Sequence, residues 1–119
     1  MLNIPEIYQE RLKEVYEHFK ALDLGNYDLY LFGSYAKEDI KETSDIDLLI
    51  LLDGPITPKE AKILRMDIRE DYEEKIGYAY EVDVKIYSRA RFHELASKLS
   101  FESEIAKYML PLKEAVLSE

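Results

Sequence analysis

The stretch "SDIDLLILLD", from Ser44 to Asp53, limits the fold of this chain more than any other feature. Its run of leucine and isoleucine, bounded by "DGP", is typical of a strand that is buried on both faces of a sheet. Asp45 and Asp47 interrupt the run, and burial of two carboxylates costs several kcal/mol unless positive charge lies beside them. The stretch therefore predicts a central strand with a cation close to its acids.

Hydrophobic periodicity on either side of this strand predicts helices and strands in alternation. The expected elements are a helix from Pro5 to near Gly25, a strand over Tyr27 to Phe32, a short helix with Ser34 as its N-cap, the strand of Ser44 to Asp53, a helix from Pro58 to Gly77 with Thr57 as its N-cap, a strand within residues 78–88, and helices from about Ser88 and Phe101. This order predicts a small α/β fold, in which helices pack on one sheet.

The apolar positions predict which side chains face the sheet. The first helix should bury Ile7, Leu12, Val15, Phe19 and Leu22. The helix after residue 88 should bury Phe92, Leu95, Ala96 and Leu99. In the strand within residues 78–88, Val82, Val84 and Ile86 should face one side, and Glu81, Asp83 and Lys85 should face the other. Pro111 is expected to bend or end the last helix, because proline lacks a backbone donor.

Length and charge narrow the class of protein. Residues 1–119 suit one domain. The formal charge of −9, from 25 acidic and 16 basic residues, disfavours a broad electrostatic contact with nucleic acid. The chain has no cysteine, and its first residues resemble neither a signal peptide nor a membrane span. We expect a cytoplasmic protein with no membrane or direct nucleic-acid partner.

Three carboxylates carry the predicted chemistry. Asp45 and Asp47 should point to one face, because strand side chains alternate with a period of two. Two such carboxylates repel each other and suit Mg²⁺, which prefers oxygen ligands and keeps positions open for phosphate. Asp83 reaches the same point if its strand pairs beside the strand that carries Asp45 and Asp47. The three acids predict a site for two metal ions that supports phosphoryl transfer.

Gly33 and Ser34 follow the strand of Tyr27 to Phe32 and predict a phosphate-binding turn. Glycine permits close approach of the backbone, and amide groups at a helix start, with the serine hydroxyl, can donate to phosphate oxygens. Lys37 or Lys41 could neutralise a phosphate, although a lysine on a short helix is more often solvated.

Each feature alone also has a structural interpretation. A pair of aspartates can lie solvated on an edge strand, and a Gly-Ser pair can simply form a turn. Lys85 could pair with Asp83, bind a phosphate, or be exposed. His18 and His93 have no partner at ligand spacing, so packing or surface positions are favoured over metal binding. The tyrosines suit packing, although one of them could stack on adenine.

Gly33-Ser34, ten residues, and then Asp45-x-Asp47 resembles the signature of the minimal nucleotidyltransferase family, within the DNA polymerase beta-like nucleotidyltransferase superfamily. The resemblance extends over nearly the whole chain in element order, and it includes the later "VDV" around Asp83. It implies a mixed sheet flanked by helices, Mg²⁺ at Asp45 and Asp47, and ATP phosphates at Gly33 and Ser34. It also implies that Asp83 acts as a ligand and general base.

The resemblance further implies transfer of AMP from ATP to a hydroxyl. Small members of this family are often antitoxins paired with a HEPN-domain RNase toxin, so a tyrosine of such a toxin is the implied acceptor. One departure is that Glu38 and Asp39 stand where a second glycine is common. Two alternatives stay open: an antitoxin that neutralises its partner by binding alone, and transfer of a nucleotide to a small molecule such as an aminoglycoside.

Overall fold

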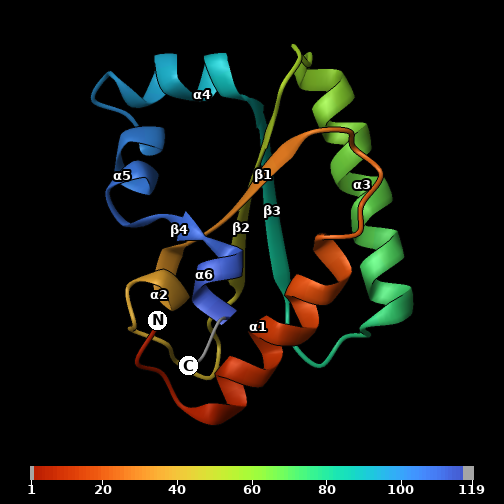
Figure 1. Cartoon of the computed structure of the whole chain (residues 1–119), viewed down its shortest axis with the longest axis vertical. Coiled ribbons are helices and arrows are strands. Elements are labelled where there is room, and N and C mark those ends of the chain that lie inside the picture. Colours follow the sequence, from red (N-terminus) through yellow and green to blue (C-terminus); the bar gives the residue numbers. More distant parts are fainter. Residues whose placement is uncertain (1, 117–119) are drawn as a thin grey trace.

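The computed structural model describes residues 2–116 as a four-stranded sheet flanked by helices (Figure 1). The elements are α1 (Glu6–Phe19), β1 (Tyr27–Phe32), α2 (Gly33–Ala36), β2 (Ile46–Leu52), α3 (Pro58–Lys75), β3 (Val82–Ser88), α4 (Arg89–Ala96), α5 (Phe101–Tyr108), β4 (Leu110–Pro111) and α6 (Leu112–Val116). Among the described residues, no helix is long and apolar enough to cross a membrane.

The sheet is mixed, with the strand order β3-β2-β1-β4. β2 pairs antiparallel with β1 and parallel with β3, and β4 pairs antiparallel with β1. The parallel pair needs a crossover, and α3 provides it. The predicted central strand is therefore confirmed, because β2 has a strand partner on each side and four of its seven residues in succession, from Leu48 to Leu51, are buried.

Helices cover both faces of the sheet, as Figure 1 shows for α1 and α3 on one side and α4 and α5 on the other. On the first face, Leu48 and Ile50 pack in one core cluster with residues of α1, α3 and α6. On the second face, Leu49 and Leu51 pack with Phe92 of α4 and Ile105 of α5. The alternation of side chains along β2 thus supplies both cores. The predicted α/β class is confirmed.

Local signals in the sequence predicted both ends of α3 correctly. The Thr57 hydroxyl accepts a hydrogen bond from the Glu60 amide at 3.1 Å, and the Glu60 carboxylate accepts one from the Thr57 amide at 2.9 Å. This reciprocal pair is a capping box, which satisfies two amide donors at the helix start. The helix ends beside Gly77, whose φ of 95° is a conformation that glycine adopts without steric cost.

The first helix was predicted too long. α1 ends at Phe19 rather than near Gly25, and the Tyr27 hydroxyl donates to the Phe19 carbonyl at 2.6 Å. The Leu22 amide also donates to this carbonyl, at 3.4 Å, so a turn and a contact from β1 close the helix end, and local periodicity cannot show that contact. Ile7 was expected to be buried but is 56% exposed, because it lies off the stripe of Leu12, Val15 and Phe19.

Three further expectations were wrong in detail. Leu99 is fully exposed, because α4 ends at Ala96 and Leu99 lies in the bend that follows. Ser34 does not cap α2, since the helix begins at Gly33 and its N-cap residue, Phe32, makes no side-chain hydrogen bond. Pro111 lies in the short edge strand β4, where a missing amide is tolerated, and the chain then continues into α6.

Candidate active site

Gly33 brings the end of β1 against the start of β2. Phe32 is the register partner of Asp47, and the next residue turns sharply, with a φ of 73° at Gly33. A Cβ atom built at Gly33 would overlap Asp47 Oδ2 and lie 2.9 Å from Asp47 Cγ. Only glycine allows both this backbone conformation and this approach. The turn therefore holds its backbone directly against the Asp47 carboxylate.

Asp47 and Asp83 are register partners on the parallel strands β2 and β3. The Asp47 side chain is partly buried, and the Asp83 side chain is exposed. Burial raises the pKa of Asp47 to about 6, with additional contributions from the negative charges of Asp83 and then Asp45, while Lys85 acts in the opposite direction. Two neighbouring carboxylates in a partly desolvated position favour binding of a cation.

Lys85 lies two residues after Asp83 on the same face of β3. Its Nζ is 3.4 Å from Asp83 Oδ2, which is one of the three positions that the sequence left open for this lysine. Asp45 differs from expectation, because β2 begins at Ile46 and Asp45 precedes it as an exposed residue. Asp45 still contributes charge to Asp47, but it is not held by the strand ladder.

A cleft of about 290 Å³ opens in front of the two acids. One wall comes from the strands and the turn after β1, and the other comes from one side of α5. Its lining residues are Phe32, Gly33, Lys37, Asp47, Asp83, Lys85, Phe101, Glu104, Ile105 and Tyr108. The Lys37 ammonium lies 5.0 Å from the centre of the Tyr108 ring, so a cation–π contact positions it at the cleft.

The structure thus brings four of the six predicted site residues to one cleft: Gly33, Lys37, Asp47 and Asp83. Ser34 and Asp45 lie nearby in the chain but are not among the described residues that line it.

The other candidates lie elsewhere. Glu38 and Asp39 are exposed and do not belong to the described lining of the cleft, so they put no charge directly against its contents. Tyr35 is fully buried and cannot stack on a ligand. His18 packs edge-on against Phe19, and its Nε2 lies 3.3 Å from Asp71 Oδ2.

Sequence reasoning missed the wall that α5 contributes. Phe101 and Tyr108 are more than half exposed, and Glu104 lies between them on the same helix. Their spacing of seven residues places the two aromatics on one face of the helix, and this face is exposed instead of packed in the core. That spacing was visible in the sequence, but the position of α5 across the cleft from the starts of β2 and β3 was not.

The donor set fits a divalent cation. Within residues 2–116, no three histidine, cysteine or acidic side chains already lie together as a metal cage. Asp47 and Asp83 nevertheless face one cleft as register partners, and Mg²⁺ is usually held by one or two carboxylates together with the phosphates of its substrate. The oxygen donors and the raised pKa of Asp47 are consistent with that mode of binding.

Comparison with known proteins identifies the family. The family model described as "Nucleotidyltransferase domain" matches residues 12–110, which include every element of the cleft. The chain belongs to the nucleotidyltransferase family. It is thus an enzyme of the nucleotidyltransferase class, as the resemblance in the sequence indicated.

Two relatives of this nucleotidyltransferase come from Methanocaldococcus jannaschii, and both are named as candidate protein adenylyltransferases. One is 30% identical over 102 residues, which cover 86% of this chain and 91% of the relative. The other is 31% identical over 102 residues, with the same coverage of each chain. The likeness therefore extends over nearly the full length of both relatives.

Among solved structures, a chain from a toxin–antitoxin crystal structure with AMP-PNP is similar at 13% sequence identity and a TM-score of 0.43. The alignment covers 91% of this chain and 83% of that chain. This likeness is too distant to support an argument about function.

Proposed function

We propose that this nucleotidyltransferase transfers AMP from ATP to a hydroxyl group of a protein. The observation that carries the proposal is the pairing of Asp47 and Asp83 in register, with the Gly33 backbone held against Asp47. The relatives named as candidate protein adenylyltransferases support a protein acceptor. The raised pKa of Asp47 supports a site that gains stability when a cation binds.

In the proposed reaction, the acceptor oxygen attacks the α-phosphorus of ATP in line with the leaving group. A bond forms between that oxygen and phosphorus, the bond from phosphorus to the bridging oxygen breaks, and pyrophosphate leaves with the electron pair. Asp83 accepts the hydroxyl proton, since its exposed carboxylate lies at the cleft. The Gly33 turn and Lys37 orient the phosphates, and Ser34 can add a hydroxyl donor if the turn adjusts on binding.

Asp47, with Asp83 and Asp45, would hold Mg²⁺, and we assign two ions to these three carboxylates. Bound Mg²⁺ supplies neutralisation of phosphate charge and a template for in-line geometry. Lys85 orients Asp83 in the absence of the cation, through the contact of 3.4 Å between Nζ and Oδ2.

For the biological acceptor, we propose a tyrosine of a cognate HEPN-domain RNase toxin, so that the chain acts as an antitoxin. The support is the resemblance of Gly33-Ser34 and Asp45-x-Asp47 to the minimal nucleotidyltransferase signature. In this proposal, residues 1–119 act as one domain. The net charge of −9 also suits a partner with a basic surface, as an RNA-cleaving protein would have.

Incubation with ATP, MgCl₂ and the purified product of the adjacent reading frame tests the proposal. We expect mass spectrometry to find one or more AMP units on a tyrosine of that partner. Asp47→Asn should abolish the modification while circular dichroism shows a folded protein, because it changes a ligand and not the core. A verified partner that remains unmodified under these conditions would contradict the proposal.

A cellular assay distinguishes neutralisation by binding alone from neutralisation that requires AMP transfer. If the double variant Asp45→Asn, Asp47→Asn still protects cells from the partner, docking is sufficient and transfer is not required. If protection is lost while the variant still forms the complex, transfer is required. The complex itself is measured by size-exclusion chromatography of the two purified proteins.

A further inference from the structure

The edge of the sheet at β3 has an unpaired side. In the part of the chain that the structure describes, β3 pairs only with β2. The Glu81 carbonyl faces β2, because it accepts a hydrogen bond of 2.9 Å from the first amide of that strand. Backbone groups alternate along a strand, so those of Val82, Val84 and Ile86 point to the free edge. The Tyr72 hydroxyl donates to the Val82 carbonyl at 2.6 Å, which leaves Val84 and Ile86 available.

Two hollows follow this edge. One, of about 250 Å³, lies between α3 and residues 82–84, and the other, of about 520 Å³, lies between α3, α4 and residues 85–88. Together they border all seven residues of β3, and Arg65 lines both. Because their lining includes successive strand residues, whose side chains alternate between the two faces of the sheet, the hollows follow the edge rather than one face. We call the two hollows together the β3 groove.

The β3 groove is basic in an acidic protein. Its charged lining residues are Lys62, Arg65, Arg69, Lys85, Arg91 and Asp83. Five of the 16 basic residues of the chain therefore line it, but only one of the 25 acidic residues does. Such a concentration of positive charge selects an acidic ligand.

Two of these cations are available for a partner. Arg69 and Arg91 each pair with an acid on their own helix, at 3.0 and 2.7 Å. Within residues 2–116, Lys62 and Arg65 lie in no ion pair of this kind, and both come from α3 at the side of the groove. They are the positions at which a substitution changes the charge of the groove without breaking an internal pair.

The β3 groove meets the cleft at the catalytic carboxylate. Asp83 lines the first hollow and the cleft, and Lys85 lines the second hollow and the cleft. An extended chain along β3 would therefore pass beside Asp83. Seven strand residues span about 23 Å, so the groove has the length of a peptide segment of about seven residues.

We propose that the β3 groove binds an extended acidic segment of the acceptor protein, which adds to β3 as a strand and brings its hydroxyl to Asp83. The proposal rests on the proposed function, because it assigns a docking surface to the acceptor of that reaction. Main-chain hydrogen bonds at Val84 and Ile86 give affinity, and the cations of α3 select acidic side chains.

Fluorescence anisotropy with labelled peptides tests the groove without any transfer chemistry. The probe is a fluorescein-labelled peptide of about nine residues, alternating glutamate and valine around a central tyrosine, and the matched probe has lysine in place of glutamate. We expect the glutamate peptide to bind at least about tenfold more tightly than the lysine peptide. N-methylation of alternate amides should weaken binding, because it removes the donors of the added strand.

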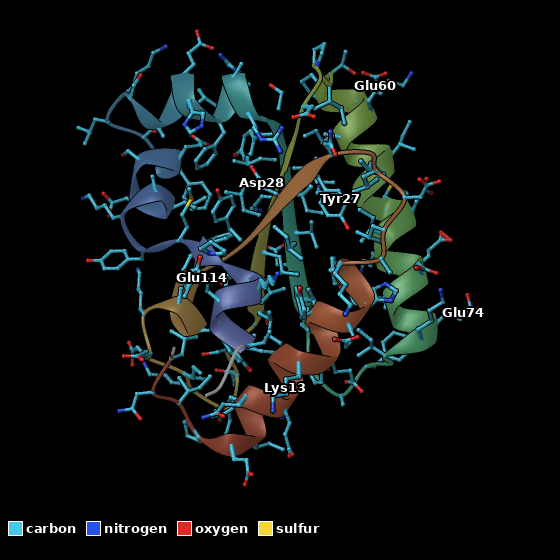
Figure 2. All side chains as sticks on the ribbon, in the orientation of Figure 1. Lys13, Tyr27, Asp28, Glu60, Glu74 and Glu114 are labelled. Atoms are coloured by element: carbon cyan, nitrogen blue, oxygen red, sulfur yellow. The ribbon has the colours of Figure 1, made fainter. Side chains whose placement is uncertain are left out.

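Two double variants distinguish the effect of charge in the groove from the effect of net charge on peptide binding. Lys62→Glu with Arg65→Glu should weaken binding of the glutamate peptide by about tenfold or more. Lys13→Glu with Lys113→Glu changes the net charge by the same amount on α1 and α6, outside the groove, and should change binding less than about twofold. Lys13 is labelled on α1 in Figure 2.

Three results would overturn the proposal: equal binding of the two peptides, equal losses in the two double variants, or tighter binding of an oligothymidylate than of the glutamate peptide. The last result would assign the groove to nucleic acid. Failure of the proposed function is distinct, because it would be seen as no AMP on any protein acceptor while the peptide still binds. Transfer to a protein without selective peptide binding would contradict the groove alone.

Discussion

Replacement of Asp47 by asparagine should stabilise the protein in the absence of a divalent cation. The pKa of this carboxyl is about 6 in the folded protein, against an ordinary value of 3.8. Folding therefore favours the protonated form, and the ionised form opposes folding. Asparagine has nearly the same shape and no charge, so it removes the destabilising negative charge and leaves the turn at Gly33 in place.

The sign of the pH dependence follows from proton linkage. Between about pH 4 and pH 6 the folded protein binds more protons at Asp47 than the unfolded chain does, so the free energy of unfolding falls as the pH rises through this range. Above about pH 6 this contribution is constant. A rise of about two pKa units corresponds to at most about 3 kcal/mol, and solvent screening of this partly exposed side chain reduces it to about 1–2 kcal/mol.

Urea denaturation followed by circular dichroism, in EDTA and from pH 4 to pH 8, measures this effect. We expect Asp47→Asn to be more stable than the wild-type protein at pH 7.5 by about 1–2 kcal/mol, with the two curves converging at about pH 4. Asp67→Asn, on the exposed side of α3, is the matched control and should lie within about 0.5 kcal/mol of the wild type. A variant that is less stable at pH 7.5, or a difference that does not depend on pH, would refute the reasoning.

Other predictions follow from single contacts. Gly33→Ala should destabilise the fold by about 1–3 kcal/mol in urea denaturation, through the positive φ and the overlap with Asp47, and a neutral result would contradict the described turn. Tyr72→Phe should cost about 1–1.5 kcal/mol, because the buried Val82 carbonyl loses its donor; an unchanged denaturation midpoint would show that this bond is absent. Thr57→Ala should cost about 1 kcal/mol through loss of the helix cap, whereas Thr57→Ser should retain most of the stability. MgCl₂ should raise the melting temperature of the wild-type protein more than that of Asp47→Asn, because Asp47 binds the cation. Equal increases in melting temperature would show that Asp47 is not a ligand of the cation.

The central part of the fold could be predicted because its signals are local. The run of apolar residues in β2, the alternation in β3 and the cap at Thr57 each depend on a few neighbouring residues. The sequence predicted that Asp83 lies beside Asp47 only if their two strands are neighbours, because strand order depends on contacts between distant segments. The structure shows that β2 and β3 are parallel neighbours, with Asp47 and Asp83 in register.

Errors arose where tertiary contacts override local pattern. The last carbonyl of α1 accepts a hydrogen bond from the hydroxyl of Tyr27, which lies eight residues beyond the helix end. β4 was missed because two residues give no periodicity, and its pairing with β1 defines it. The aromatic residues of α5 at the cleft were missed because their function depends on where the helix packs.

The site shows the same division. A sequence signature indicated Gly33 and Asp47, and their contact explains why glycine stands at that position. The signature treated Asp45 and Asp47 as equivalent, but the strand begins between them, so one carboxylate is partly buried and the other is exposed. This difference predicts that substitution of Asp47 is more damaging to transfer than substitution of Asp45.

The most direct test of the account is which phosphate of ATP becomes attached to the acceptor. Parallel reactions contain the partner protein, MgCl₂ and ATP labelled at either the α- or the γ-phosphorus. The account predicts label on the partner from the α position alone, release of pyrophosphate, and no label with Asp47→Asn. Label from the γ position, or α label that persists with Asp47→Asn, would contradict nucleotidyl transfer at this site.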